Sequence, residues 1–263
     1  MSSSRNRFDD FFEDASYVSL KNHLYNYQVR KRAIERELAD EQIRLVLETG
    51  SGISPVVSGS DRVVYSELSL PACRMLKQLT GGGRHVVADA TRLPFRAGSF
   101  SHVVCSEVLE HVEDDEGVLR ELARVAAPDG TVIVTVPHRE CFFANDDRYV
   151  NHYRRYELGS IECKLRKAGL EPVGVRKVLG PLEKLTMMVA VLVFETAARR
   201  GKRATRRGST MLHRAYVLFN RIYAQVVRFD AWVMPRFLSS CLLVKARAAS
   251  GQVDKKLAAS ANL

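Results

Sequence analysis

The sequence predicts an α/β fold, with a mostly parallel sheet and helices on both faces. Two observations support this prediction. Short apolar runs alternate with helical patterns between Ile43 and Pro137, as in strand–helix–strand crossovers. Two consecutive apolar runs also end near a carboxylate, the first at Glu48 and the second at Glu67. Because the carboxyl ends of parallel strands meet at one edge of a sheet, these groups are expected to lie together there.

The first loop, Leu45-Val-Leu-Glu-Thr-Gly-Ser-Gly-Ile-Ser54, follows a predicted strand and carries two glycines in G-x-G spacing. Gly50 and Gly52 let the backbone approach a ligand that a side chain would block. A dinucleotide-binding loop needs a third glycine, and this sequence has Pro55 in its place. The loop also carries Glu48, which suits a ligand with a positive end better than a pyrophosphate.

The other elements follow in chain order. A helix is expected over residues 24–40, and a second begins at Ser54-Pro55, a favourable N-cap and first-turn pair. The later helices are expected over Leu70–Leu79, Glu116–Val125 and Arg154–Ala168, the last ended by Gly169. Beyond the first strand, strands are expected over residues 62–67, 85–89, 98–106, 128–137, 171–177 and 239–247.

The segments after Glu67 carry a family resemblance. They include His85-Val-Val-Ala-Asp89, then Gly98–Ser106 followed by Glu107-Val-Leu-Glu-His-Val112, and Pro128–Pro137. In this order and spacing, they resemble the class I S-adenosylmethionine-dependent methyltransferases, especially the type 11 branch that includes quinone C-methyltransferases. The resemblance runs from Leu45 to His138 and more loosely beyond. It implies a Rossmann-like, seven-stranded sheet, a helical insertion before the last strand, and S-adenosyl-L-methionine as cofactor.

The resemblance also assigns cofactor contacts. The glycine loop would hold the methionine part, Glu67 would accept from the ribose hydroxyls, and Asp89 would accept from the adenine amino group. Methyl transfer from a sulfonium needs alignment of the acceptor and exclusion of water rather than a nucleophilic triad. The residues expected to bind the cofactor are Glu48, Gly50, Ser51, Gly52, Glu67, Leu68, Asp89, Ala90, Ser106 and Glu107.

Acceptor-side residues are expected after the fourth and fifth strands. His111, His138 and His152 are the catalytic candidates, because a histidine can take a proton from a hydroxyl or enol acceptor near neutral pH. Tyr153 and Arg154 are the candidates for substrate binding, since an arginine can clamp an anionic group. The alternative is that His152 and Arg154 only cap and stabilise their loop.

Composition limits the class of protein. The chain has 263 residues, of which 46% are hydrophobic, enough for a sizeable core. Its five cysteines are scattered and never in C-x-x-C spacing, so neither a disulfide framework nor a metal site is expected. The first 20 residues are polar and acidic, without a basic-then-apolar leader. The expected location is therefore the cytoplasm. Peripheral contact at the inner face of a membrane is compatible with it.

Positive charge is concentrated in residues 179–237, which carry +8 of the net +10. An apolar run of about 13 residues from Leu182 is shorter than the roughly 20 that span a bilayer. The basic run 199–207 and interleaved aromatics and arginines follow it. We expect residues 182–237 to contact an anionic membrane surface. A lid packed on its own domain is the alternative, and nucleic acid is the least favoured partner.

These features predict five segments. They are an N-terminal cap (1–42), a methyltransferase core (43–178), a basic and aromatic helical insertion (179–237), a closing strand (238–247) and a disordered tail (248–263). The leading function is methyl transfer to a small or lipid-linked acceptor. The alternatives are an RNA or tRNA methyltransferase and a non-catalytic scaffold that binds membrane or protein. The sequence predicts neither the acceptor nor the oligomeric state.

Overall fold

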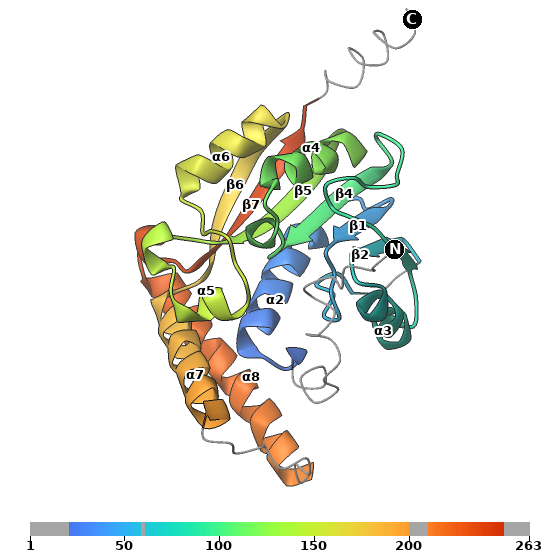
Figure 1. Ribbon diagram of the computed structural model, residues 1–263. Coiled ribbons are helices and arrows are strands. Elements are labelled where there is room, and N and C mark those ends of the chain that lie inside the picture. The colour runs from blue at the N-terminus through green and yellow to red at the C-terminus, as the bar shows by residue number, and fades with distance from the viewer. Residues whose placement is uncertain (1–20, 59–60, 200–209, 250–263) are drawn as a thin grey trace, which may run out of the picture.

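One seven-stranded sheet organises the computed structural model, which describes residues 21–58, 61–199 and 210–249 (Figure 1). The strand order is β3-β2-β1-β4-β5-β7-β6. Strands β1 to β5 pair in parallel, whereas β7 runs antiparallel to both of its neighbours, β5 and β6. This arrangement confirms the predicted fold class. The strands are β1 (Val46–Thr49), β2 (Val63–Glu67), β3 (Arg84–Val87), β4 (Phe100–Ser106), β5 (Ala126–Pro137), β6 (Leu170–Leu179) and β7 (Cys241–Ala248).

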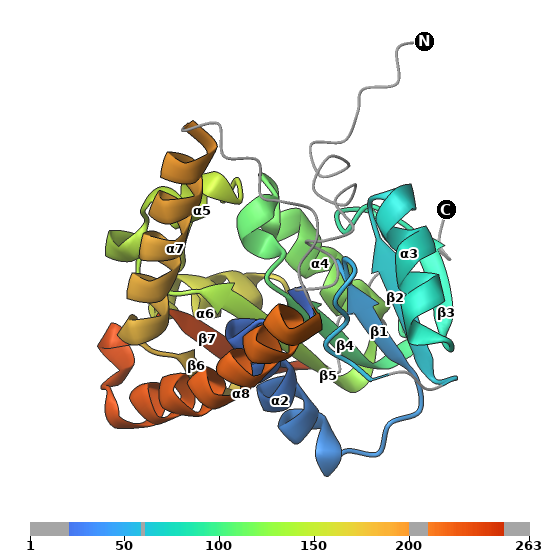
Figure 2. The ribbon, with the colours of Figure 1, turned by 90° about the horizontal axis from the view of Figure 1, so that it is seen from below.

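Helices cover both faces of the sheet (Figures 1 and 2). Helices α4 and α6 bury Leu122 and Ile161 on one face. Helices α2, α3 and α8 bury Ile34, Leu76 and Val227 on the other face. The helices are α2 (Tyr25–Ala39), α3 (Leu70–Thr80), α4 (Asp115–Val125), α5 (Asn145–Tyr149), α6 (Leu158–Lys167), α7 (Pro181–Arg199) and α8 (Thr210–Val233), with short 3₁₀ turns η2 (Leu109–His111), η3 (Glu140–Phe142) and η4 (Arg236–Leu238).

Two predicted helices differ from the structure. Residues 50–58 form turns without a helix, so the helix start predicted at Ser54-Pro55 is wrong. Strand β2 already begins at Val63, which leaves too few residues for a crossover helix after the glycine loop. Helix α6 begins only at Leu158, because Tyr156 forms an extended bridge with His138.

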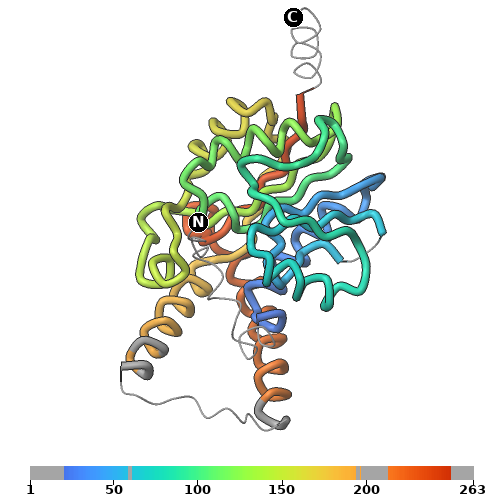
Figure 3. The backbone as a smooth tube through the Cα atoms, turned by 45° about the vertical axis from the view of Figure 1, so that its right-hand side comes forward, coloured from blue at the N-terminus to red at the C-terminus, as the bar shows by residue number. Residues whose placement is uncertain are grey.

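The insertion between β6 and β7 consists of α7 and α8, which extend away from the sheet in Figure 3. Helix α8 packs on α2 through an edge-to-face contact of Tyr223 with Tyr25, whose ring centroids are 4.8 Å apart. Its other side exposes large apolar side chains, including Phe229 at 63% and Trp232 at 74%. No helix within the described residues is both long and apolar enough to cross a membrane.

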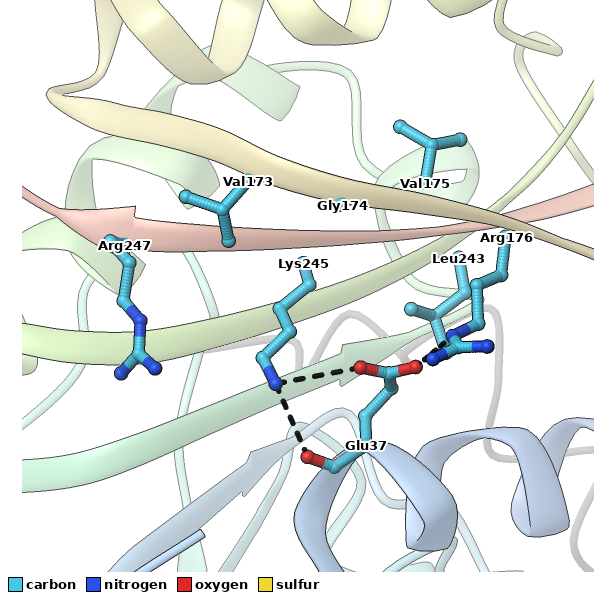
Figure 4. Close-up of a pocket in the computed structure, with 8 residues that line it drawn as sticks. All are labelled: Glu37, Val173, Gly174, Val175, Arg176, Leu243, Lys245 and Arg247. Carbon is cyan, nitrogen blue, oxygen red and sulfur yellow. Dashed lines mark hydrogen bonds and ion pairs between the residues drawn. The ribbon is translucent and has the colours of Figure 1, made fainter. Parts of the chain in front are cut away.

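A hollow on the outer side of β6 and β7 holds several charged groups (Figure 4). Glu37 of α2 forms ion pairs with Arg176 and with Lys245, the latter at 3.4 Å. Lys245 also pairs with Glu41 at 2.8 Å. These ion pairs hold α2 against the edge of the sheet formed by β6 and β7.

Candidate functional site

The central cavity lies outside the carboxyl ends of β1, β2 and β4, where the strand order reverses. Ligands of open α/β sheets bind at this position. The cavity has a volume of about 360 Å³. Every residue that the sequence assigned to the cofactor lines it, namely Glu48, Gly50, Ser51, Gly52, Glu67, Leu68, Asp89, Ala90, Ser106 and Glu107.

The loop after β1 depends on its two glycines. Gly50 has a φ of +69°, and Gly52 has a φ of +55°, a region that side chains disfavour. A Cβ atom at Gly50 would lie 2.4 Å from a methyl of Val108, so a side chain there would have to displace the loop after β4. The Gly50 N–H donates to the Ser66 carbonyl at 2.8 Å, which fixes the loop beside the end of β2.

Glu67, at the end of β2, has both carboxylate oxygens bonded to backbone amides. The Gly52 N–H donates to Oε2 at 2.8 Å, and the Ser69 N–H donates to Oε1 at 3.0 Å. The side chain therefore ties the glycine loop to the start of α3. Each oxygen retains a second lone pair. The carboxylate can thus accept hydroxyl protons from a ligand in the cavity while it holds the loop.

Glu48 supports the loop in a way the sequence did not predict. Its carboxylate accepts the N–H groups of Val56 and Val57 at 2.8 Å each. Burial raises the pKa of Glu48 to about 7, and the two amides oppose this rise. The residue lines the cavity, but its oxygens stabilise the turn instead of facing the positive end of a ligand, which corrects the interpretation of this acid.

Asp89 and Ala90 form the wall after β3. Asp89 Oδ1 accepts both the N–H and the hydroxyl of Thr91 at 2.8 Å. This is the turn-forming role that aspartates commonly play. In the described part of the chain, the hydrogen bonds of Asp89 go to Oδ1. Oδ2 is thus placed to accept from a ligand, as the cofactor assignment requires.

Ser106 and Glu107 close β4. Glu107 has a φ of +55°, a conformation that a non-glycine residue adopts at a cost of about 1–2 kcal/mol. Its carboxylate accepts from the Thr135 hydroxyl at 3.2 Å and pairs with Arg30 at 3.7 Å. Arg30 also lines the cavity, so a positive charge lies on its wall beside Glu107.

Two of the three catalytic candidates reach the cavity. His111 and His152 both line it, with their ring centroids 4.6 Å apart and the rings edge-to-face. His152 Nδ1 lies 2.8 Å from Asp147 Oδ1. A buried carboxylate therefore orients the His152 ring on the cavity wall.

The remaining acceptor-side candidates lie elsewhere. His138 is only 3% exposed and is not among the residues that line the cavity. Burial lowers its pKa to about 4, so the ring is a neutral core group. Tyr153 and Arg154 are also absent from its lining; Arg154 pairs with Asp115 at 3.0 Å, and its guanidinium lies over the Tyr153 ring. The geometry of the cavity therefore gives no support to the predicted site roles of His138, Tyr153 and Arg154.

Other cavity residues escaped the sequence analysis. Arg155 takes the place predicted for Arg154, and it bonds Asp147 at 2.8 Å. Glu183 and Met187 of α7 also line the cavity, so the insertion forms one of its walls. Burial raises the pKa of Glu183, which accepts from the Ser240 hydroxyl at 2.7 Å. In the sequence, the feature that could have indicated this wall is Glu183, an acidic residue at the start of an apolar run.

Comparison with known proteins gives a match to part of the chain. Residues 47–134 match the family model described as a methyltransferase domain. Among curated proteins, the demethylmenaquinone methyltransferase of Streptomyces griseus is 30% identical over 102 residues, which cover 39% of this chain and 44% of that protein. The chain spans less than half the length of the first curated relatives it matches.

Solved structures share the fold. The phosphoethanolamine N-methyltransferase 2 of Haemonchus contortus, in complex with S-adenosyl-L-methionine, is 16% identical with a TM-score of 0.58 over 94% of this chain and 61% of that one. A SAM-dependent methyltransferase of Thermotoga maritima is 15% identical with a TM-score of 0.59 over 92% and 97%. The chain thus has the class I methyltransferase fold, and the matched domain implies S-adenosyl-L-methionine as cofactor.

The central cavity fits this cofactor. Gly50 and Gly52 present backbone without side chains, and among the described residues only the Lys21 amine comes near the Cβ position of Gly52, at 3.8 Å. Glu67 offers acceptor oxygens for the ribose hydroxyls, and Asp89 offers one for the adenine amino group. Acceptors for the hydroxyl and amino groups of an adenosine are therefore present at the ends of the adjacent strands β2 and β3.

Proposed function

We propose that this chain is a methyltransferase that uses S-adenosyl-L-methionine to methylate a small or lipid-linked acceptor. One observation carries the proposal. The glycine loop and the carboxylates that follow β1, β2, β3 and β4 converge on a single cavity. The matched methyltransferase domain contains these same strand ends.

The cofactor supplies an electrophilic methyl group, and the protein supplies position and shielding. The loop at Gly50 and Gly52 holds the methionine part, Glu67 accepts from the ribose, and Asp89 accepts from the adenine. Arg30 beside Glu107 provides a positive charge on the same wall, suited to the methionine carboxylate.

The acceptor occupies the part of the cavity near His111, His152 and α7. Support comes from the shared cavity, which His111 and His152 line together with Glu183 and Met187 of α7. A relative is named for demethylmenaquinone, which favours an acceptor with an oxygenated ring. A histidine in this position can take the proton that such a ring releases.

Contact with an anionic membrane is the finer part of the proposal. Helix α8 exposes Phe219 and Ile222 next to Arg214 and Arg221, an apolar surface interleaved with positive charge. Amphipathic helices of this type lie in the interface of anionic bilayers. The basic run 199–207 adds charge by sequence, although its structure lies outside the described residues.

The deciding experiment follows the methyl group. The full chain is incubated with methyl-labelled S-adenosyl-L-methionine and a cell extract, which is then separated into lipid, RNA and soluble fractions. Label in a lipid or soluble small molecule is the expected result. Label in RNA would favour the alternative of an RNA methyltransferase and overturn the proposed acceptor class.

Calorimetry tests the remaining alternative. Binding of S-adenosyl-L-methionine and of its demethylated product is expected from the full chain. A folded protein that binds neither compound would favour the non-catalytic scaffold and overturn the proposed function.

A further inference from the structure

A cluster of Glu110, His111 and His152 lies beside the central cavity. Each of the three side chains offers one ligand atom, and these atoms lie within 4.8 Å of one another. Glu110 and His111 come from the turn η2 after β4, whereas His152 comes from the loop after α5. We propose that these three residues bind a divalent transition-metal ion at the acceptor side of the cavity.

Glu110 provides the first argument. Its side chain is fully buried, and within the described residues neither carboxylate oxygen has a hydrogen-bond partner. A buried carboxylate without partners is strongly unfavourable unless a cation or a proton compensates it. Within the described residues, the nearest group that can be positively charged is His152, whose Nε2 lies 3.8 Å from Glu110 Oε1, beyond hydrogen-bond distance.

His152 provides the second argument. Its Nδ1 lies 2.8 Å from Asp147 Oδ1. Arg155 Nε and Lys184 Nζ also donate to Asp147, at 2.8 and 2.6 Å. An ionised carboxylate only accepts hydrogen bonds, so Nδ1 carries the hydrogen. The other ring nitrogen, Nε2, faces Glu110 Oε1 at 3.8 Å. In the tautomer with its single hydrogen on Nδ1, Nε2 has a lone pair that can bind an ion.

The arrangement matches how proteins prepare histidine ligands. A carboxylate on the far nitrogen of a ligating histidine fixes its tautomer and orientation. The Nε2 of His152 and the Oε1 of Glu110 face each other, and Oε1 has no hydrogen-bond partner among the described residues. The ring of His111 stands edge-to-face against His152 and brings a third ligand to the same space.

The ligand types select the ion. Two imidazoles and one carboxylate suit zinc and its neighbours in the first transition row, and suit magnesium or calcium poorly. Ligand atoms around a tetrahedral zinc lie ~3.4 Å apart, given bonds of about 2.1 Å. The present spacing of 3.8 to 4.8 Å is wider. Side-chain rotations that move each ligand atom by about an ångström would bring the three atoms to the spacing of a tetrahedral site.

The position of the cluster suggests its use. His111 and His152 line the cavity, so a bound ion would keep a coordination position open toward it. That position fits a hydroxyl, enol or carbonyl oxygen of the acceptor, which the ion would orient and polarise. This use rests on the proposed methyltransferase function, whereas metal binding itself does not.

Direct binding is the test. The full chain is stripped with a chelator and titrated with zinc chloride at pH 7.5 without S-adenosyl-L-methionine. We expect one zinc per chain and at least hundredfold weaker magnesium binding. Glu110→Gln and His152→Ala should each weaken zinc binding at least tenfold. His213→Ala, which removes an exposed histidine of α8, should leave it unchanged.

Several outcomes would overturn the metal site. The first is no zinc binding by the full chain. The second is an equal loss of zinc affinity in His152→Ala and His213→Ala, and the third is unchanged zinc affinity in Glu110→Gln. Each outcome would mean that a shared proton, and not a metal ion, compensates the charge of Glu110. If Glu110→Gln does not fold, His111→Ala is judged by the same tenfold criterion. Binding of S-adenosyl-L-methionine is measured separately. A full chain that binds zinc but not S-adenosyl-L-methionine would refute the proposed function alone. A full chain that binds S-adenosyl-L-methionine but not zinc would refute the metal site alone.

Discussion

Replacing Glu67 by alanine tests the assignment of the cofactor cavity. The carboxylate is 8% exposed and holds the N–H groups of Gly52 and Ser69. In the proposed complex it also accepts from the ribose, and a hydrogen bond to a charged group contributes about 1.5–3 kcal/mol. Allowing for water that replaces the lost contact, we expect affinity to fall by about 1–3 kcal/mol, or roughly 5- to 150-fold.

The same change affects folding, so two measurements are needed. Leaving two amides without their acceptor should lower the free energy of unfolding by about 1–3 kcal/mol. Calorimetry gives the dissociation constant, and urea denaturation shows that the variant is folded at the assay temperature. Glu171→Ala, which removes an exposed acid on β6, is the matched control and should change neither quantity. A folded Glu67→Ala protein with unchanged cofactor affinity would refute the assigned position of the ribose.

Three further predictions follow from the fold and the site. Gly50→Ala should lower the free energy of unfolding by about 1–3 kcal/mol, because the new methyl group meets Val108 and the backbone has a positive φ. Gly82→Ala, whose Cβ position has no described atom within 4 Å, should lose less than half as much in the same urea titration. His138 has its pKa lowered to about 4 by burial, so its contribution is complete above pH 6.5 and is lost as pH falls toward 4. Wild type should lose about 2 kcal/mol more than His138→Gln between pH 7.5 and 5, and parallel curves from the two proteins would contradict this. Replacing both Phe229 and Trp232 by serine should weaken binding to anionic vesicles at least fivefold in a flotation assay without changing cofactor affinity, and equal flotation of wild type with neutral vesicles would count against the electrostatic part of the proposal.

The cofactor half of the site could be predicted from the sequence because its residues are fixed by strand ends. Glu67 follows an apolar run directly, and Gly50 and Gly52 follow another. Once the strands are parallel and adjacent, the backbone alone brings these positions together. Glu48 was expected to face the positive end of a ligand, and this expectation failed for a different reason. Its partners Val56 and Val57 lie in a turn that no local sequence pattern predicts.

The acceptor half could not be predicted in the same way. Whether His138, His152, Arg154 or Arg155 faces the cavity depends on the path of the loop after β5, which packing against α7 and β7 decides. Arg154 and Arg155 are neighbours in sequence, yet one pairs with Asp115 outside the cavity and the other with Asp147 on its wall. Periodicity does not resolve such a choice in an irregular segment.

Strand β7 is the only partner of β6 within the described sheet. Ser240, just before β7, and Cys241, its first residue, also line the cavity. During synthesis, β6 leaves the ribosome long before β7 does, with the whole α7–α8 segment between them. The nascent chain must therefore carry an unpaired strand edge and an incomplete cavity until almost its last described residues appear. Removing β7 by truncation should therefore lower the yield of folded protein, because it leaves this edge unpaired.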